Sequence, residues 1–154
     1  MGKTVFIFCA LILSLRGLFA GEPVTFSIDT RTPGAAIPPD FLGLSYETSR
    51  MLPDEKDAHY FRPDNAPLIE TFRTLGVKSL RIGGNSVDAS LIAIPSEEDI
   101  RAFFDFARAA GAKVIYSVRL HGGDPASAAK IAQLIHEHYA DVLDRFAIGN
   151  EPDY

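Results

Sequence analysis

The sequence predicts an α/β fold with a parallel sheet: the N-terminal half of a (β/α)8 TIM barrel, or part of a doubly wound sheet. From residue 41 onward, short apolar runs typical of buried strands alternate with longer segments of helical periodicity. Strands that alternate with helices imply parallel strands joined by right-handed crossovers. The chain holds neither G-x-G-x-x-G nor a complete phosphate-loop motif, so the nucleotide-binding form of a doubly wound sheet has no support.

The first 20 residues are expected to be a secretory signal peptide. Lys3 gives a positive start, residues 4–15 form a nearly unbroken apolar run, and Ala20 is a small residue suited to cleavage. The apolar run is shorter than the roughly 20 residues that a membrane-spanning helix needs. We therefore expect a secreted or periplasmic protein with no stable membrane anchor after cleavage.

Composition narrows the class of protein. The chain has 154 residues, and its hydrophobic fraction of 47% is typical of a globular protein. Without the predicted signal peptide, 13 basic and 20 acidic residues remain, which gives a net charge of −7, and no cysteine remains. The acidic balance argues against nucleic acid as a partner. Because disulfides are excluded, a hydrophobic core must stabilise the exported chain.

Two segments precede the α/β pattern. Residues 24–29, "VTFSID", alternate apolar and polar side chains and predict a half-buried strand of an antiparallel sheet. Residues 30–40 contain three prolines and one glycine and predict a turn or linker. Residues 21–40 are therefore expected to be a lone strand and a linker, followed by an α/β domain over residues 41–154.

The α/β domain is expected to hold four strands and three helices. The strands are predicted at residues 41–47, 78–84, 112–120 and 144–150, and the helices at residues 66–76, 96–111 and 124–141. The second helix has the clearest boundaries, with Ser96 as N-cap, acidic residues in the first turn and Gly111 as the stop. Asp124 is expected to cap the third helix, with Pro125 at its first position.

Polar side chains follow each predicted strand at its carboxyl end. They are Ser45, Tyr46 and Glu47, then Arg81 and Asn85, then Arg119 and His121, and last Asn150 and Glu151. Because parallel strands end at the same edge of a sheet, we expect these groups to share that edge, which carries the active site in barrels. Gly83 and Gly84 would let a ligand or a neighbouring backbone approach closely.

Glu151 is expected to be held at this edge by the proline that follows it. Pro152 favours an extended backbone at Glu151 and removes a ladder donor, so the fourth strand should stop there. Glu151 would then project into the mouth of the barrel, where it could act as a general acid. The side-chain amide of Asn150 could donate a hydrogen bond to a substrate hydroxyl.

Three motifs carry a resemblance to a known family. "IGNEP" at the end of the fourth strand resembles the Asn-Glu-Pro acid/base motif of retaining glycosidases with (β/α)8 barrels. Together with "FLGLSYE" and "SLRIGGNSVD", it resembles glycoside hydrolase family 79, the heparanase and β-glucuronidase family. The similarity runs from about residue 24 to residue 154. It implies a retaining O-glycosyl hydrolase that acts on carbohydrate containing uronic acid and uses no cofactor or metal.

The resemblance also implies roles for single residues. Glu151 would be the acid/base, and Asn150 would bind the 2-hydroxyl of the sugar. Glu47, Asn85 and Ser86 would contact the glycone sugar. Residues 24–29 would be the strand that family members lend to a separate β-sandwich domain, which this chain lacks.

A retaining mechanism needs a second carboxylate, roughly 5–5.5 Å from the first. In the resembled family this nucleophile follows the seventh barrel strand, and a full barrel takes about 250 residues. We therefore expect the chain to be an N-terminal fragment of the catalytic barrel, inactive alone because the nucleophile is missing. We also expect poor solubility, because a half barrel leaves strand edges unpaired and apolar surface exposed.

Some residues keep two interpretations. Arg81 either pairs with the catalytic carboxylates or forms an ion pair at the barrel rim. Asn85 is otherwise a turn residue at a strand end. His121 is a further candidate for the lining of the site. His136 and His138 point to different sides of the third helix, which predicts a solvated face rather than a metal site.

The function also has alternatives. Within enzymes, another retaining barrel family that uses Asn-Glu-Pro, such as an arabinofuranosidase or a xylosidase, fits the motif. Outside enzymes, the chain would be a non-catalytic fragment or a weak sugar-binding module. The phenylalanines at 103, 104 and 106 predict helix packing rather than a base-stacking platform, in agreement with the acidic charge.

Overall fold

The computed structural model describes residues 24–153, which fall into two units that divide between residues 36 and 37. The predicted signal peptide lies outside the described residues. In the first unit, residues 24–29 form no strand, and Val24, Phe26 and Ile28 are each at least 77% exposed. A strand needs a neighbouring strand to bond its backbone. The strand at residues 24–29 and its pairing with a β-sandwich therefore both stay predictions.

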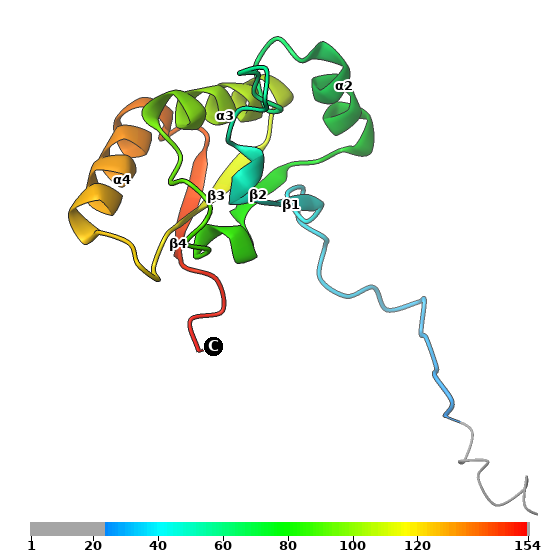
Figure 1. Cartoon of the computed structure of the whole chain (residues 1–154). Coiled ribbons are helices and arrows are strands. Elements are labelled where there is room, and N and C mark those ends of the chain that lie inside the picture. The colour runs from blue at the N-terminus through cyan, green and yellow to red at the C-terminus, as the bar shows by residue number, and fades with distance from the viewer. Residues whose placement is uncertain (1–23, 154) are drawn as a thin grey trace, which may run out of the picture. The chain divides into compact units, whose positions relative to one another are not determined.

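The second unit is an α/β structure with a four-stranded, all-parallel sheet, as predicted (Figure 1). The strands lie in the order β1-β2-β3-β4 and span Gly43–Glu47, Ser79–Gly83, Lys113–Val118 and Leu143–Ile148. Three helices connect them: α2 (Ala66–Leu75), α3 (Glu97–Ala110) and α4 (Pro125–Tyr139). Short 3-10 helices follow β1 and β2, namely η2 (Thr48–Arg50) and η3 (Asn85–Val87).

The consecutive strand order places the three helices on one face of the sheet. Right-handed crossovers that all step in the same direction have this consequence, and Figure 1 shows α2, α3 and α4 on the same side. Side chains of alternate strand residues are buried under them, including Leu80, Ile82, Val114 and Tyr116. Half a barrel and half a doubly wound sheet share this arrangement, so the order alone is compatible with both.

An aromatic cluster forms the centre of this core. Phe103, Phe104 and Phe106 of α3 are completely buried, which confirms that they serve helix packing. Phe61, from the segment between β1 and α2, packs edge-on against Phe103 with ring centroids 5.2 Å apart. Phe72 of α2 packs edge-on against Phe106 at 5.1 Å. The first contact holds the segment between β1 and α2 against α3, and the second holds α2 against α3.

The helix ends follow the predicted signals. Ser96 caps α3 in a reciprocal capping box with Asp99, and Gly111 ends the helix with φ of 75°. Asp124 accepts hydrogen bonds from the first turn of α4, and Pro125 opens that helix. The start of α2 was not predicted in detail: the side chain of Asn65 caps it by accepting from the Leu68 N–H.

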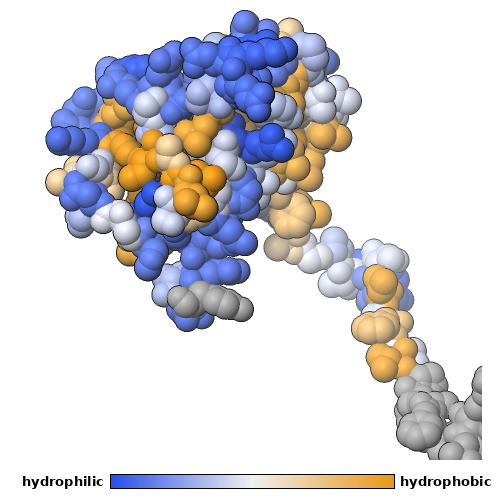
Figure 2. Space-filling model, viewed as in Figure 1, coloured by the Kyte–Doolittle hydropathy of each residue, from blue (hydrophilic) through white to orange (hydrophobic). Residues whose placement is uncertain are grey.

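On the face seen in Figure 2, the second unit carries hydrophilic regions with apolar patches between them. Its exposed large apolar residues include Phe41, Leu91, Leu120 and Ile148. Among residues 24–153, no helix combines the length and apolar character that a membrane crossing requires.

Candidate active site

The polar groups predicted at the strand ends do come together at one edge of the sheet. β1, β2, β3 and β4 run parallel, so their carboxyl ends share that edge. Hydrogen bonds link the predicted site residues into two neighbouring sets. Glu47 and Ser86 join the ends of β1 and β2. Arg81, Asn85 and Asn150 join the ends of β2 and β4.

Glu47 ends β1 and leans onto the turn after β2. Its carboxylate accepts a 2.7 Å hydrogen bond from the Ser86 N–H. This bond from the Ser86 backbone is the main cause that lowers the pKa of Glu47 below its usual value. This approach is possible because Gly84 has no side chain and adopts φ of 66°: a Cβ there would lie 2.3 Å from one carboxylate oxygen. Glu47 remains exposed and has acceptor capacity left for a ligand.

The hydroxyl of Ser86 is engaged with backbone rather than open to a ligand. It accepts from the Ser49 N–H at 3.1 Å and donates to the Gly83 carbonyl at 3.4 Å. Thr48 donates to the same carbonyl at 3.2 Å. Ser86 therefore joins η2 to the end of β2. The expected sugar contact of Ser86 competes with this bonding.

Arg81 fits neither of its two expected roles among the described residues. Its guanidinium forms no ion pair there and instead donates to the Ser45 hydroxyl at 3.2 Å and to the side-chain oxygen of Asn150 at 3.0 Å. Asn150 in turn donates from its amide nitrogen to the side-chain oxygen of Asn85 at 2.9 Å. Because a guanidinium can only donate, the side-chain oxygen of Asn150 must face Arg81. The amide nitrogen of Asn150 then faces Asn85, so the side-chain oxygen of Asn85 must face Asn150.

This chain of amides leaves N–H groups directed away from Arg81. Asn150 has a second amide hydrogen, and the amide nitrogen of Asn85 is not used by the chain of bonds. Both can donate to an oxygen of a ligand. An open hollow lies beside them, lined by Asn85, Asp88, Asn150 and Glu151.

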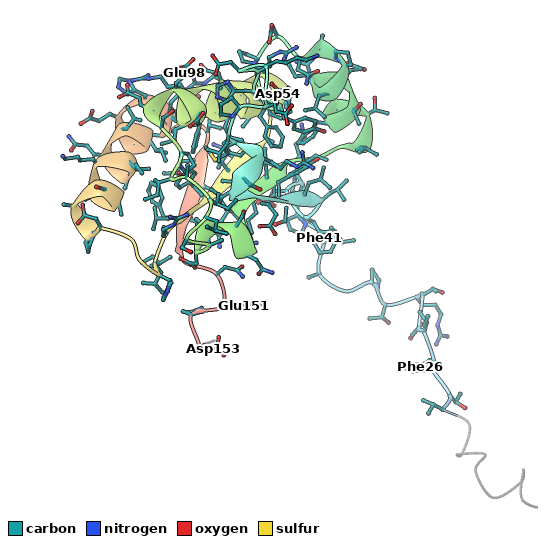
Figure 3. The ribbon with its side chains drawn as sticks, in the orientation of Figure 1. Phe26, Phe41, Asp54, Glu98, Glu151 and Asp153 are labelled. Carbon is teal, nitrogen blue, oxygen red and sulfur yellow. The ribbon has the colours of Figure 1, made fainter. Side chains whose placement is uncertain are left out.

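Glu151 lies at the rim of this hollow and is exposed to solvent (Figure 3). Two details of its prediction are wrong. β4 ends at Ile148 rather than at residue 150, so the strand does not reach Glu151, and the φ of Glu151, 49°, is left-handed rather than extended. Gly149, with φ of 66°, turns the chain just after β4, and this turn outweighs the preference of Pro152 for an extended backbone at Glu151. Among the described residues, the side chain of Glu151 makes no hydrogen bond.

Asp88 also belongs to this edge of the sheet, although it was not predicted as a site residue. Its carboxylate accepts from the backbone N–H groups of Leu120, His121 and Asn150, each at 2.8 Å. Partial burial raises the pKa of Asp88, but these donors and the nearby Arg119 outweigh burial and lower it. The only hint in the sequence is that Asp88 is the sole carboxylate between the second strand and the second helix.

Arg119 and His121, which follow β3, have structural contacts. The Arg119 guanidinium donates to the carbonyls of Val87, Ala89 and Ile92 and so holds the loop after η3. His121 donates its backbone N–H to Asp88, and its side chain is exposed outside the hollow.

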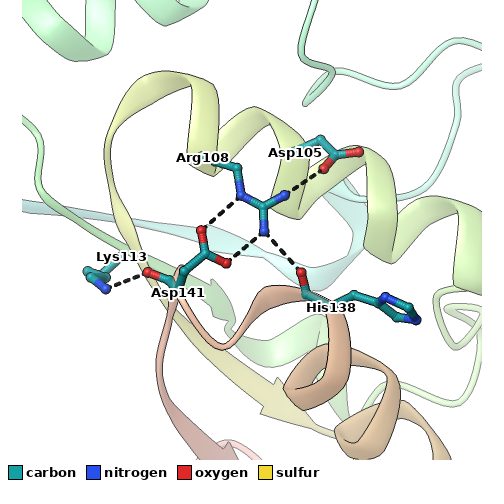
Figure 4. A network of polar contacts seen from close by, with 5 residues as sticks. All are labelled: Asp105, Arg108, Lys113, His138 and Asp141. Atoms are coloured by element: carbon teal, nitrogen blue, oxygen red, sulfur yellow. Dashed lines mark hydrogen bonds and ion pairs between the residues drawn. The ribbon is translucent and has the colours of Figure 1, made fainter.

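No metal centre is evident in the part of the chain that the structure describes. Within residues 24–153, no three or more His, Cys, Asp or Glu side chains are arranged to hold an ion. His136 and His138 are exposed on α4. At the opposite edge of the sheet, Arg108 bridges α3 to the end of α4 through Asp141 and the His138 carbonyl, with Lys113 bonded to the Asp141 carbonyl (Figure 4). These contacts join the ends of α3 and α4 beside an open hollow lined by Arg108, Lys113 and Asp141.

Comparison with protein-family models gave no match for this chain, and comparison with curated proteins gave none.

Proposed function

We propose that this chain is the acid/base-bearing part of a retaining glycoside hydrolase of the β-glucuronidase or heparanase type. The observation that supports it is the meeting of Asn85, Asn150 and Glu151 around one hollow at the carboxyl edge of a parallel sheet. This edge is where barrel enzymes carry their catalytic groups. A carboxyl beside amide donors is the equipment for proton transfer to a glycosidic oxygen and for binding of sugar hydroxyls.

The proposal includes a barrel architecture. One face of the sheet is covered by α2, α3 and α4 (Figure 1). On the other face, Ser45, Arg81 and Ile115 lie in register across β1, β2 and β3, and no described element packs over them as a layer. In a closed barrel this second face would be the interior. Arg81 and Ser45 would then support the site from inside the barrel.

The residues would divide the reaction as follows. Glu151 would donate its proton to the glycosidic oxygen while the bond from that oxygen to the anomeric carbon breaks and a carboxylate nucleophile bonds to that carbon. Glu151 would next take a proton from the water that releases the sugar. Asn150 would donate to the 2-hydroxyl, and Asn85 and Glu47 would contact the glycone. This chemistry involves no cofactor.

Asp88 is a poor candidate for the second carboxylate, although it lines the same hollow as Glu151. Three backbone N–H groups already occupy its two oxygens. These bonds stabilise the carboxylate and lower its reactivity as a base or nucleophile. We therefore assign the nucleophile to a residue outside this chain and expect the chain by itself to bind sugar without cleaving it.

The substrate class and location follow from the same proposal. A uronic-acid glycoside is the proposed substrate, and the predicted signal peptide would direct the protein to a secreted or periplasmic location. Another retaining family, of arabinofuranosidase or xylosidase type, is the alternative enzyme. A comparison of binding to a methyl glucuronide, a methyl xyloside and a methyl arabinofuranoside separates these possibilities.

A binding experiment tests the proposal. We expect methyl β-D-glucuronide, added to the isotopically labelled full chain, to shift the NMR signals of Asn85, Asn150 and Glu151. Asn150→Ala should weaken binding by about tenfold, the worth of a hydrogen bond or two to a ligand, whereas Gln133→Ala on the exposed face of α4 should not. Preference for a methyl xyloside or arabinofuranoside would favour the alternative families, and no shift with any of the three would count against a glycosidase.

An activity assay tests the absence of the nucleophile. We expect the full chain to release no nitrophenol from 4-nitrophenyl β-D-glucuronide above background. Turnover that disappears in Glu151→Gln would contradict the assignment, because it would show that this chain supplies both carboxylates.

A sugar-binding module without catalysis is the second candidate. It is favoured by the bonding of Asp88 described above, which leaves Glu151 as the one available carboxylate lining the hollow among the described residues. This candidate predicts that methyl β-D-glucuronide binds equally well to the wild type and to Glu151→Gln at every pH. That result would favour a sugar-binding site in which Glu151 transfers no proton.

A further inference from the structure

Asp88 connects three loops that each follow a different strand. One carboxylate oxygen accepts from the N–H groups of Leu120 and His121 after β3, and the other accepts from the N–H of Asn150 after β4. Asp88 itself follows η3 in the loop after β2. One side chain thereby ties the loop after β2 to the two neighbouring loops, and the proposed mechanism gives it no role.

The segment after β4 needs external support. Gly149 and Glu151 both have left-handed backbones, with φ of 66° and 49°. A non-glycine residue such as Glu151 keeps this conformation only where surrounding contacts fix it. Two backbone bonds precede it: the Gly149 N–H donates to the Val118 carbonyl and the Asn150 N–H to Asp88, both at 2.8 Å.

The contact at Asp88 is close and charged. A Cβ on Gly149 would lie 3.1 Å from one oxygen of Asp88 and 2.8 Å from Leu120 Cβ, so the turn is pressed against both residues. The backbone donors and Arg119 keep the carboxylate ionised despite partial burial, since they lower its pKa. Hydrogen bonds to an ionised acceptor are shorter and stronger than neutral ones.

We propose that Asp88 is a positioning residue. Its carboxylate holds the main chain of Asn150 against the loop after β3 and thereby sets the positions of the Asn150 and Glu151 side chains. With the Asn150 backbone fixed, its side chain meets Arg81 and Asn85, and Glu151 lies at the rim of the hollow. Asp88 acts through backbone N–H groups and not on the sugar. Only the consequence for sugar binding rests on the proposed function.

Asp88→Asn is the variant that separates positioning from general stability. Its single carbonyl oxygen can still accept from Leu120 and His121, but its amide nitrogen then faces the Asn150 N–H and repels it. We expect the Asn150 amide proton to lose its hydrogen-bonded chemical shift and to exchange with solvent at least about tenfold faster. The HN–Hα coupling of Glu151 should change from the value of a left-handed to that of an extended or averaged backbone.

Asp54→Asn is the matched control. Asp54 also accepts from two backbone N–H groups, those of Lys56 and Ala58, in a turn that does not line the hollow. It should leave the signals of Asn150 and Glu151 unchanged. Signals of Asn150 and Glu151 in Asp88→Asn that match those of the wild type would overturn the proposal.

A measurement on the wild-type chain keeps the test independent of whether the variant folds. A coupling transmitted through the hydrogen bond should connect the Asn150 amide nitrogen to the carboxyl carbon of Asp88. A second should connect the same carbon to the amide of Leu120 or His121. If the coupling to Asn150 is absent while those after β3 are present, Asp88 does not hold the segment after β4.

Binding of methyl β-D-glucuronide completes the experiment. We expect its dissociation constant to rise about tenfold in Asp88→Asn and to stay unchanged in Asp54→Asn. Wild-type affinity in Asp88→Asn would overturn the consequence for sugar binding. If the wild type fails to bind this sugar, the proposed function fails, and the couplings and the exchange rates still decide whether Asp88 positions the segment.

Discussion

At the residue scale, Gly84 decides whether Glu47 can reach the turn after β2. A Cβ at this position would lie within 2.7 Å of three carboxylate atoms of Glu47. Gly84 also has φ of 66°, a conformation that residues with a side chain avoid. Two separate demands therefore meet at one glycine: the space for a carboxylate and the backbone angle of the turn.

Gly84→Ala should destabilise the chain and move Glu47. We expect a loss of about 1–3 kcal/mol in the free energy of unfolding, because strain in the backbone adds to the clash with the carboxylate. Urea unfolding measures the loss, and the Ser86 amide shift reports whether its bond to Glu47 survives. Gly122→Ala is the control, because Gly122 has φ of 65° but nothing within 4 Å of the added Cβ. Equal losses in both variants would show that the carboxylate contact has no effect.

At the element scale, Asp99 fixes the start of α3. Its carboxylate accepts from the Ser96 N–H at 2.7 Å and from the Ser96 hydroxyl at 2.8 Å, and it pairs with His59 at 2.7 Å. Burial raises the pKa of Asp99, but the bonds with His59 and Ser96 outweigh it and lower the pKa below 3.8. The cap of α3 is thus also the anchor of the long segment between β1 and α2.

Asp99→Ala should cost about 2 kcal/mol in the free energy of unfolding at pH 7, since it removes half of a capping box and a buried partner of His59. Because the pKa is lower in the folded chain, the contribution of Asp99 is present above pH 3.8 and is lost as the pH falls through the folded-state value. Urea unfolding from pH 7 to pH 3 should therefore show a shallower acid loss in the variant.

Glu98→Ala is the control for this helix. Glu98 lies in the same first turn and carries the same charge, but it is exposed and makes no side-chain bond among the described residues (Figure 3). We expect a loss below about 1 kcal/mol from the helix dipole alone. A loss equal to that of Asp99→Ala would mean that charge, and not the cap and the bond to His59, explains the effect.

The elements could be predicted because their signals are local. Short apolar runs identified the four strands, and helical periodicity identified the three helices. Ser96, Gly111 and Asp124 marked the helix ends that lie next to them in the sequence. The meeting of strand ends at one edge also followed, because parallel strands impose it. By contrast, the strand expected at residues 24–29 depends on a neighbouring strand, which local alternation cannot supply.

The bonding inside the site could not be predicted, since it joins residues far apart in the sequence. Arg81 and Asn150 are 69 positions apart, and Asp88 and Asn150 are 62 apart. The rule that proline favours an extended residue before it is also local, and at Glu151 it is overridden by Gly149 and by the bond from Asn150 to Asp88. Residue types at strand ends named the candidates, but only the fold shows which of them support the others.

At the scale of the whole molecule, the second unit has two open sheet edges. β1 and β4 each pair with one strand only within the described residues, so each leaves backbone N–H and C=O groups unpaired on its outer side. Exposed apolar side chains lie next to these edges, including Phe41 before β1 and Ile148 at the end of β4. Open edges that carry apolar side chains are templates for pairing with other chains.

The full chain should therefore self-associate, and a charge on an edge should reduce this. We expect light scattering after size exclusion to show oligomers at tens of micromolar, and Ile148→Lys to shift the population toward monomer, because lysine on an edge strand opposes edge-to-edge pairing. Leu75→Lys is the control: Leu75 is 54% exposed, close to the 67% of Ile148, but it ends α2 and lies on no edge. A wild-type chain that stays monomeric and melts cooperatively would show that the unpaired edges of β1 and β4 do not drive association. An equal response to both lysines would show that exposed apolar area, rather than the edge, is what draws the chains together.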